Sequence, residues 1–151
     1  MQKKQNYMLF TNSCSKDINN GTASLQMDGI AIERVSICKF LGVIIDDKLN
    51  WKPHIAHITG IIARNVGVIK RIRYKINLKT ALLLYDTMIV PCLYYCNIAW
   101  ASSAKSNLSK LHALQKNQSV IFLASKFAHT TDLFYRLNRL NVYDIHLLQL
   151  A

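Results

Sequence analysis

The chain has 151 residues, a formal net charge of +11 and an isoelectric point near 9.7. This length is enough for one domain with a buried core. A hydrophobic content of 51% with 18% charged residues excludes an intrinsically disordered chain. The excess of positive charge predicts an anionic partner, either nucleic-acid phosphates or lipid headgroups. Charge alone does not distinguish these from a basic surface that has no partner.

The first fifty residues have the pattern of short strands. Residues 6–10 form an aromatic and apolar run, and the polar residues 11–22 predict a loop. Between two alternating runs, Asp28-Gly29 predicts the two-residue turn of a β-hairpin over residues 24–32. The run 40–45 is rich in β-forming residues but contains Gly42, which predicts a bulge or a close approach of another backbone.

Helical periodicity begins after Asp46. Between residues 51 and 73, apolar residues recur at steps of three or four, which predicts one buried helical face. Asn50 is predicted to cap this helix, and Pro53 fits its first turn. The basic residues lie mostly off the apolar stripe, so we expect them to face outward. The stripe consists of Ile55, Ile58, Ile62, Val66, Ile69 and Ile72.

Further helices are predicted over residues 78–101 and 106–124, and Pro91 should bend or split the first of them. Thr131-Asp132 and Asp144 are predicted to open two shorter helices. Strands first and helices afterwards predict an α+β fold, with short N-terminal antiparallel β-hairpin strands followed by a mainly α-helical, bundle-like region.

The apolar stretch 81–100 is as long as a transmembrane helix. It contains Asp86, Pro91 and Asn97, and a charge is costly in a lone spanning helix, so a central helix of a helical domain is the simpler interpretation. The start of the chain lacks the apolar core of a signal peptide, which predicts an intracellular protein, nuclear or cytoplasmic, with reduced cysteines.

Two groups of side chains have the spacing of partial metal sites. Cys92 and Cys96, four residues apart, are expected to share one helical face and to be buried thiols. His54 and His57 lie near a helix start but supply only two ligands. The sequence therefore predicts no metal site from either group.

Asp46-Asp47 follows an apolar strand, as paired carboxylates do in a two-metal phosphoryl-transfer site. Such a site needs a further carboxylate from another strand, and no upstream acid is suitably placed. The competing interpretation is that both acids lie before a helix N-terminus, where the helix dipole favours them. We therefore expect no catalytic residue and no resident cofactor in this chain.

The basic stretch 48–79 is the strongest functional signal. It belongs to a longer segment, from Lys48 to Thr131, that contains twelve Lys or Arg and only one acid, Asp86. Trp51 and Tyr74 could stack on bases or cover the core, and the cations could meet phosphates. The alternative is a solvated charged face of an amphipathic helix. Three cations within residues 70–73 favour nucleic acid.

Four segments in order resemble the reverse transcriptases of non-LTR (LINE-type, jockey-like) retrotransposons. Residues 40–55 (FLGVIIDDKLNWKPHI) are similar to a motif just after the catalytic palm of that family. Residues 82–85 (LLLY) with 89–100 (IVPCLYYCNIAW), and residues 108–120 (LSKLHALQKNQSV), are similar to two downstream segments, and residues 5–10 (QNYMLF) to an upstream strand.

This resemblance implies a C-terminal fragment of a right-hand polymerase. Residues 1–48 would be the end of the palm with a primer-grip-like hairpin, and residues 49–151 a helical thumb or connection. The family's catalytic aspartates, which hold two Mg²⁺ ions, would lie before Met1. The chain alone is therefore expected to be inactive, with an RNA/DNA template–primer duplex and the palm domain as partners and no membrane partner.

The residues expected to bind nucleic acid fall into two sets. The resemblance implies that four residues of the grip do so, namely Phe40, Leu41, Gly42 and Val43. The basic and aromatic pattern adds Lys48, Trp51, Lys52, Arg64, Lys70, Arg71, Arg73 and Lys75. The alternatives are a basic helical module that binds an acidic protein, without a nucleic-acid role, and a membrane-associated helical protein.

Overall fold

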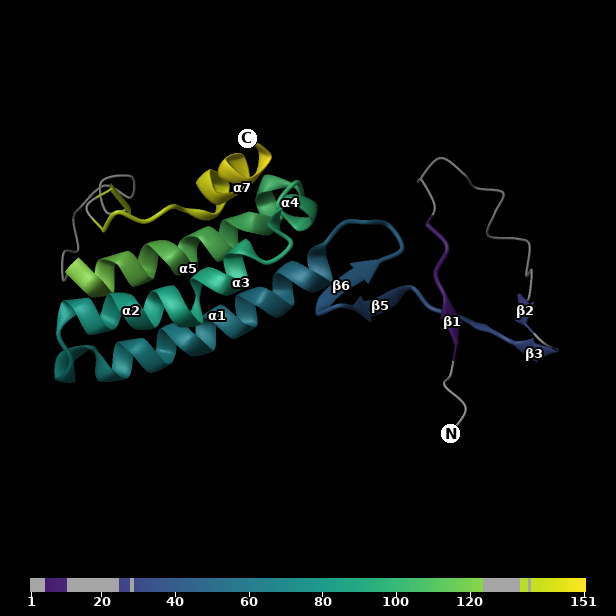
Figure 1. Ribbon diagram of the computed structural model, residues 1–151, viewed down its shortest axis with the longest axis horizontal. Coiled ribbons are helices and arrows are strands. Elements are labelled where there is room, and N and C mark those ends of the chain that lie inside the picture. Colours follow the sequence, from purple (N-terminus) through teal and green to yellow (C-terminus); the bar gives the residue numbers. More distant parts are fainter. Residues whose placement is uncertain (1–4, 11–24, 28, 124–133, 136) are drawn as a thin grey trace. The chain divides into compact units, whose positions relative to one another are not determined.

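The computed structural model describes residues 5–10, 25–27, 29–123, 134–135 and 137–151 (Figure 1). The chain divides into two compact units, Met1–Pro53 and His54–Ala151. The first unit contains short strands and the second is helical, so the predicted α+β class is confirmed. We describe each unit by itself.

The described residues of the first unit form three pairs of strands. Strand β1 (Asn6–Tyr7) pairs in parallel with β4 (Glu33–Arg34), so the strand predicted over 6–10 is shorter than expected. Strands β2 (Gln26–Met27) and β3 (Ile30–Ala31) form the predicted hairpin, whose Gly29 has a φ of +75°. The loop predicted over 11–22 lies outside the described residues.

The third pair overturns the bulge predicted at Gly42. Strands β5 (Ile37–Phe40) and β6 (Val43–Asp46) form an antiparallel hairpin, with Phe40 opposite Val43. The two residues between them, Leu41 and Gly42, have φ angles of +46° and +84°. Positive φ at both positions is the geometry of a tight hairpin turn that follows the strands' twist. Gly42 therefore permits a turn between two strands, and residues 40–45 do not form one interrupted strand.

Helix α1 (Lys52–Ile72) opens the helical part of the chain and continues into a short 3₁₀ turn, η2 (Arg73–Lys75). The predicted stripe is buried at five of its six residues, and the sixth, Ile72, is half-buried. The five buried residues are Ile55, Ile58, Ile62, Val66 and Ile69. The helix starts two residues beyond Asn50, so the prediction of Asn50 as its N-cap is wrong.

Pro91 splits the next helical stretch, as predicted. Helix α2 (Leu78–Met88) is capped by Asn77, and α3 (Val90–Tyr94) has the proline at its start. A second break occurs at Cys96, whose φ is +51°, before α4 (Asn97–Trp100). Cys92 and Cys96 therefore do not share a helix, and Cys96 is exposed rather than buried. Of the helices in the described residues, none has both the length and the apolar character that a bilayer crossing demands.

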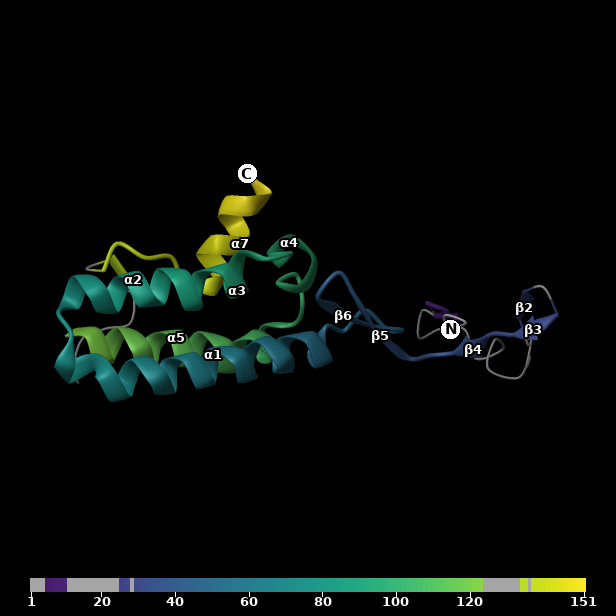
Figure 2. The same cartoon turned by 60° about the horizontal axis from the view of Figure 1, so that its bottom comes forward.

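Helix α5 (Lys105–Leu123) runs alongside α1 and α2 in both views (Figures 1 and 2). Helix α7 (Val142–Leu150) is capped by Asn141, and Asp144 lies in its first turn rather than opening it. The helix predicted from Thr131-Asp132 begins outside the described residues.

Two buried polar side chains hold α7 against the other helices. Gln115 of α5 is fully buried; its Nε2 donates to the Tyr85 hydroxyl at 3.2 Å, and its Oε1 accepts from the Val142 backbone N–H at 2.9 Å. The buried amide of Asn97 donates to the Leu93 carbonyl and lies 3.2 Å from the His146 ring nitrogen. These bonds fix α7 in one orientation, because a buried polar group left without a partner is costly.

Candidate nucleic-acid interface

One side of α1 carries a row of arginines and glycines opposite its buried stripe. Gly60, Arg64, Gly67 and Arg71 recur at steps of four, three and four, so they lie along one line of the helix surface. Both arginines are exposed. We call these four residues the outer row of α1. The seven-residue spacing of its arginines corresponds to about 10 Å along the axis.

Gly60 and Gly67 were not singled out in the sequence, although their spacing of seven, opposite the stripe, would have revealed them. A Cβ atom at either position would meet nothing within 4 Å, so packing does not require glycine there. A glycine inside a helix costs about 0.5 to 1 kcal/mol relative to alanine. The exposed Gly60 leaves room in the outer row for close approach by another backbone. At Gly67, which is half-buried, the backbone carbonyl accepts a hydrogen bond from Arg71 Nε at 3.3 Å.

The end of α1 adds a denser group of cations. Lys70 and Arg71 lie in its last turn, Arg73 and Lys75 in η2, and Lys79 in the first turn of α2. All are exposed except Arg73, which is half-buried. We call residues 70–79 the α1–α2 corner. A helix C-terminus favours cations, but the start of α2 does not, so the dipole explains only part of this charge.

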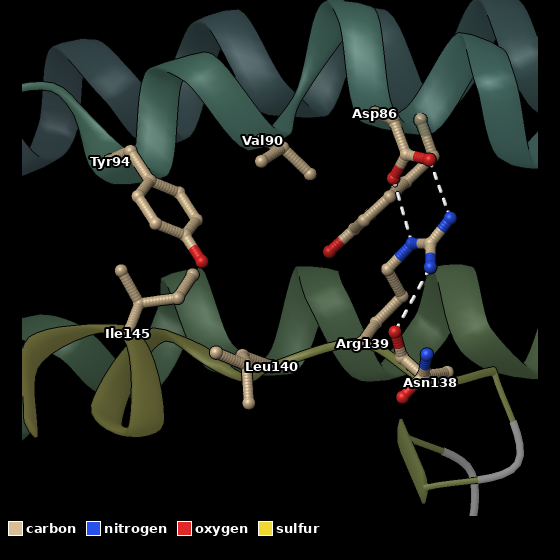
Figure 3. Close-up of a pocket in the computed structure, with 8 residues that line it drawn as sticks. Asp86, Val90, Tyr94, Asn138, Arg139, Leu140 and Ile145 are labelled. Atoms are coloured by element: carbon tan, nitrogen blue, oxygen red, sulfur yellow. Dashed lines mark hydrogen bonds and ion pairs between the residues drawn. The ribbon is translucent and has the colours of Figure 1, made fainter. Parts of the chain in front are cut away.

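The described acids of the helical unit lie outside the α1–α2 corner and are bonded to other residues of the chain. Arg139 binds Asp86 through two hydrogen bonds, Nε–Oδ1 at 2.7 Å and Nη2–Oδ2 at 2.5 Å (Figure 3). Asp144 accepts a hydrogen bond from the Asn141 side-chain amide. No other acid occurs in the described part of residues 54–151, and the α1–α2 corner contains none.

A cavity of about 360 Å³ lies beside the Asp86–Arg139 pair (Figure 3). The remaining guanidinium nitrogen of Arg139 donates to the backbone carbonyl of Asn138 at 2.9 Å, so the only charged groups in the cavity wall are bonded to the protein itself. Val90, Leu140 and Ile145 supply apolar lining. The Asp86–Arg139 pair therefore holds the segment before α7 against α2. It leaves neither charged group of the cavity without a bond to the protein.

The predicted grip residues lie together at the tip of the β5–β6 hairpin in the first unit. The side chains of Phe40 and Leu41 are 61% and 74% exposed, whereas Val43 is buried. A leucine with φ +46° is strained, since only glycine and a few polar residues adopt this region readily. The hairpin therefore presents two large apolar side chains to solvent on a strained turn.

Asp46 has a structural role in the loop that leads to α1. Its carboxylate is buried and accepts hydrogen bonds from the backbone N–H groups of Asn50 at 3.0 Å and Trp51 at 2.9 Å. Leu49 and Trp51 both have positive φ, so these bonds hold a strained loop in place. Of the predicted cations, Lys48 lies in this loop and Lys52 is the first residue of α1; both are exposed, while Trp51 is half-buried.

His54 belongs to the core of the helical unit. It is buried and packs its ring edge-on against Trp100, with centroids 6.0 Å apart. His57 is exposed. Burial, and secondarily the nearby charge of His57, lowers the pKa of His54. The described residues contain no group of three or more His, Cys, Asp or Glu side chains that could hold a metal ion.

Comparison with curated proteins identifies three relatives, each named after a transposon or mobile element. The chain is 26% identical over 106 residues to the probable RNA-directed DNA polymerase from transposon BS of Drosophila melanogaster. It is 24% identical over 109 residues to the retrovirus-related Pol polyprotein from type-1 retrotransposable element R1 of Bradysia coprophila. It is 29% identical over 94 residues to the RNA-directed DNA polymerase from mobile element jockey of Drosophila melanogaster.

The chain is similar in sequence to RNA-directed DNA polymerases of non-LTR retrotransposons. The predicted resemblance is thereby confirmed. The alignments cover 60 to 70% of this chain, but the chain spans only about a tenth of each relative's length. No protein-family model matches it, and no solved structure matches it significantly.

Replacing Asp46 by alanine should lower the free energy of unfolding by about 2 kcal/mol, because the backbone N–H groups of Asn50 and Trp51, in two part-buried hydrogen bonds, lose a charged acceptor. Asp47→Ala is the matched control and should cost no more than about 0.5 kcal/mol. Urea unfolding followed by circular dichroism measures both. Equal losses for the two variants would contradict the loop-holding role of Asp46.

The pH dependence of stability tests the buried state of His54. The pKa of His54 is lowered in the folded chain. Below about pH 6.5, His54 therefore binds a proton in the unfolded chain while it stays neutral in the folded chain. Stability should therefore fall as pH decreases from about 6.5 toward the folded pKa. Thermal midpoints between pH 7.5 and 5 should decline less steeply for His54→Gln than for the unaltered chain, and parallel curves would refute this. His112, whose pKa burial also lowers, contributes a decline that remains in the variant.

Proposed function

We propose that this chain holds a nucleic-acid template–primer duplex and does not itself supply the catalytic metal site. In this proposal, the outer row of α1 and the α1–α2 corner meet phosphates, as a thumb does, and the β5–β6 hairpin tip grips the primer end. The observation that carries it is the exposed row of cations, with the acids of the described helical unit bonded within the protein.

The electrostatics of the helical unit support phosphate as the ligand. Along a duplex axis parallel to α1, the distance of about 10 Å between the two arginines corresponds to roughly three nucleotide steps of one strand, given a rise of about 3.4 Å per nucleotide. The exposed Gly60, one turn before Arg64, lets a sugar–phosphate backbone approach the helix closely. Contacts of this kind position a duplex without reading its sequence.

The relatives supply the type of duplex. Their names describe RNA-directed DNA polymerases, which copy RNA into DNA. An RNA–DNA duplex is therefore the ligand that we propose for this chain, and the two-metal chemistry would belong to residues outside it. The alternative of an acidic protein partner remains an outcome of the experiments below.

Affinity for a labelled RNA–DNA duplex should fall steeply with salt. If about four phosphates are neutralised, raising salt from 50 to 200 mM should weaken binding by roughly 100-fold, through counterion release. The triple reversal Lys70→Glu, Arg71→Glu and Arg73→Glu should weaken binding further and flatten the salt slope by about three. Fluorescence anisotropy measures both quantities.

A matched control places the same three charge changes on α5, where Lys105, Lys110 and Lys116 are all exposed. This variant has the same net charge but keeps the α1–α2 corner. It should bind much more tightly than the corner variant. Equal losses of duplex affinity in the two variants would show that only the net charge matters. Pull-down of an acidic protein that survives nuclease treatment would favour the alternative function of binding an acidic protein.

The hairpin tip can be tested separately from the cations. Leu41→Gly relieves the positive φ and should raise the free energy of unfolding by about 0.5 to 1 kcal/mol. Because it also removes the exposed apolar side chain, it should weaken binding to the duplex. Leu49→Gly relieves a similar φ of +51° away from the tip and should leave affinity unchanged. If both variants bind alike, the tip is not a grip.

A further inference from the structure

Tyr74 is the most exposed large apolar side chain in the described part of the chain. Its relative exposure is 94%, so it covers no part of the core. It lies in the middle of η2, and the half-buried residues Ile72 and Ile76 flank this turn on either side. The turn is thus held by its neighbours while the phenol ring stands in solvent.

Tyr74 has a cationic residue on each side in the sequence, Arg73 and Lys75. The ten residues of the α1–α2 corner include five cations and no acid. An isolated exposed tyrosine is ordinary on a protein surface. An aromatic ring within a dense cationic group is the combination that single-strand binding uses, with cations for the backbone and a ring for a base.

A continuous duplex gives this ring no target. Its phosphates need only positive charge, and each base face inside a duplex is already covered by the next base pair. A base becomes available for stacking where a strand is unpaired, at an overhang or in a single-stranded segment. The exposed ring therefore matches a partner that has at least one unpaired base beside its phosphates.

We infer that the α1–α2 corner binds a single-stranded nucleic-acid segment by stacking an unpaired base on Tyr74 while the neighbouring cations contact its phosphates. The inference rests on the proposed function and deepens it. It adds a partner form, a duplex with a single-stranded extension, and a residue that distinguishes this form from a blunt duplex.

The test compares labelled oligonucleotides of equal length by fluorescence anisotropy with the full 151-residue chain. The probes are a single strand, in RNA and DNA versions, a blunt RNA–DNA duplex and an abasic single strand. Tyr74→Ala should weaken binding to the single strands about 5- to 150-fold, the range for loss of one stacked base, and leave the blunt duplex unchanged. Tyr74→Trp should retain the affinity, because indole also stacks.

Two controls separate stacking from general effects. Tyr135→Ala removes another highly exposed tyrosine, 85% exposed and outside the corner, and should change nothing. The abasic strand should bind the unaltered chain as weakly as the normal strand binds Tyr74→Ala. Equal loss on single strand and blunt duplex would overturn the stacking role.

Failure of this inference is distinguishable from failure of the proposed function. If Tyr74→Ala binds single strands normally while reversal of the corner charges still abolishes duplex binding, the stacking inference is wrong and the proposed function stands. If no oligonucleotide binds in a salt-dependent way, both are wrong.

Discussion

Burial of the isoleucine stripe on α1 is the constraint on which the rest of the helical unit depends. With Ile55, Ile58, Ile62 and Ile69 in the core, the 3.6-residue period leaves Arg64 and Arg71 on the opposite side. No separate interaction is needed to present these arginines to solvent, since the packing of one face orients the other. The Asn65 side chain, which donates to the Met88 carbonyl at 2.8 Å, further fixes α1 against α2.

Polar contacts between distant segments bond the described acid Asp86 and the buried amide of Gln115 within the helical unit. Arg139 engages Asp86, and Gln115 joins α2, α5 and the start of α7 through two hydrogen bonds. Each of these contacts joins residues that are far apart in the sequence and gives a charged or polar group a partner within the protein. The result is a cationic surface on α1 and the α1–α2 corner that no described acid of the helical unit offsets. A polyanion is the partner that such a surface attracts.

The loop between β6 and α1 shows how a residue with a catalytic pattern can have a structural role. Asp46 follows a strand, as a metal-binding aspartate would, but its two carboxylate oxygens accept the backbone N–H groups of Asn50 and Trp51. Similarity to RNA-directed DNA polymerases of non-LTR retrotransposons is thus compatible with a chain whose acids hold its loops. In our proposal this chain contributes contacts to the duplex.

The sequence by itself determined the elements whose signal is local. The period of the isoleucines predicted α1, Asp28-Gly29 predicted the first hairpin, and Pro91 predicted the division of the next helix, since each follows from backbone geometry within a few residues. Local signals misled where two outcomes share one pattern. Gly42 could signal a bulge or a turn, and only the pairing of Phe40 with Val43 decided for the turn.

Tertiary structure alone decided which distant polar groups bond to one another and which aromatic side chains stay uncovered. No spacing rule connects Asp86 to Arg139, or Gln115 to Val142, because such partners meet only when distant segments pack. The same holds for Tyr74, whose exposure depends on what the neighbouring helices leave uncovered. Backbone preferences depend on a few neighbouring residues and can be predicted from sequence. The pairing of distant charged and polar groups depends on contacts that form only when the chain folds.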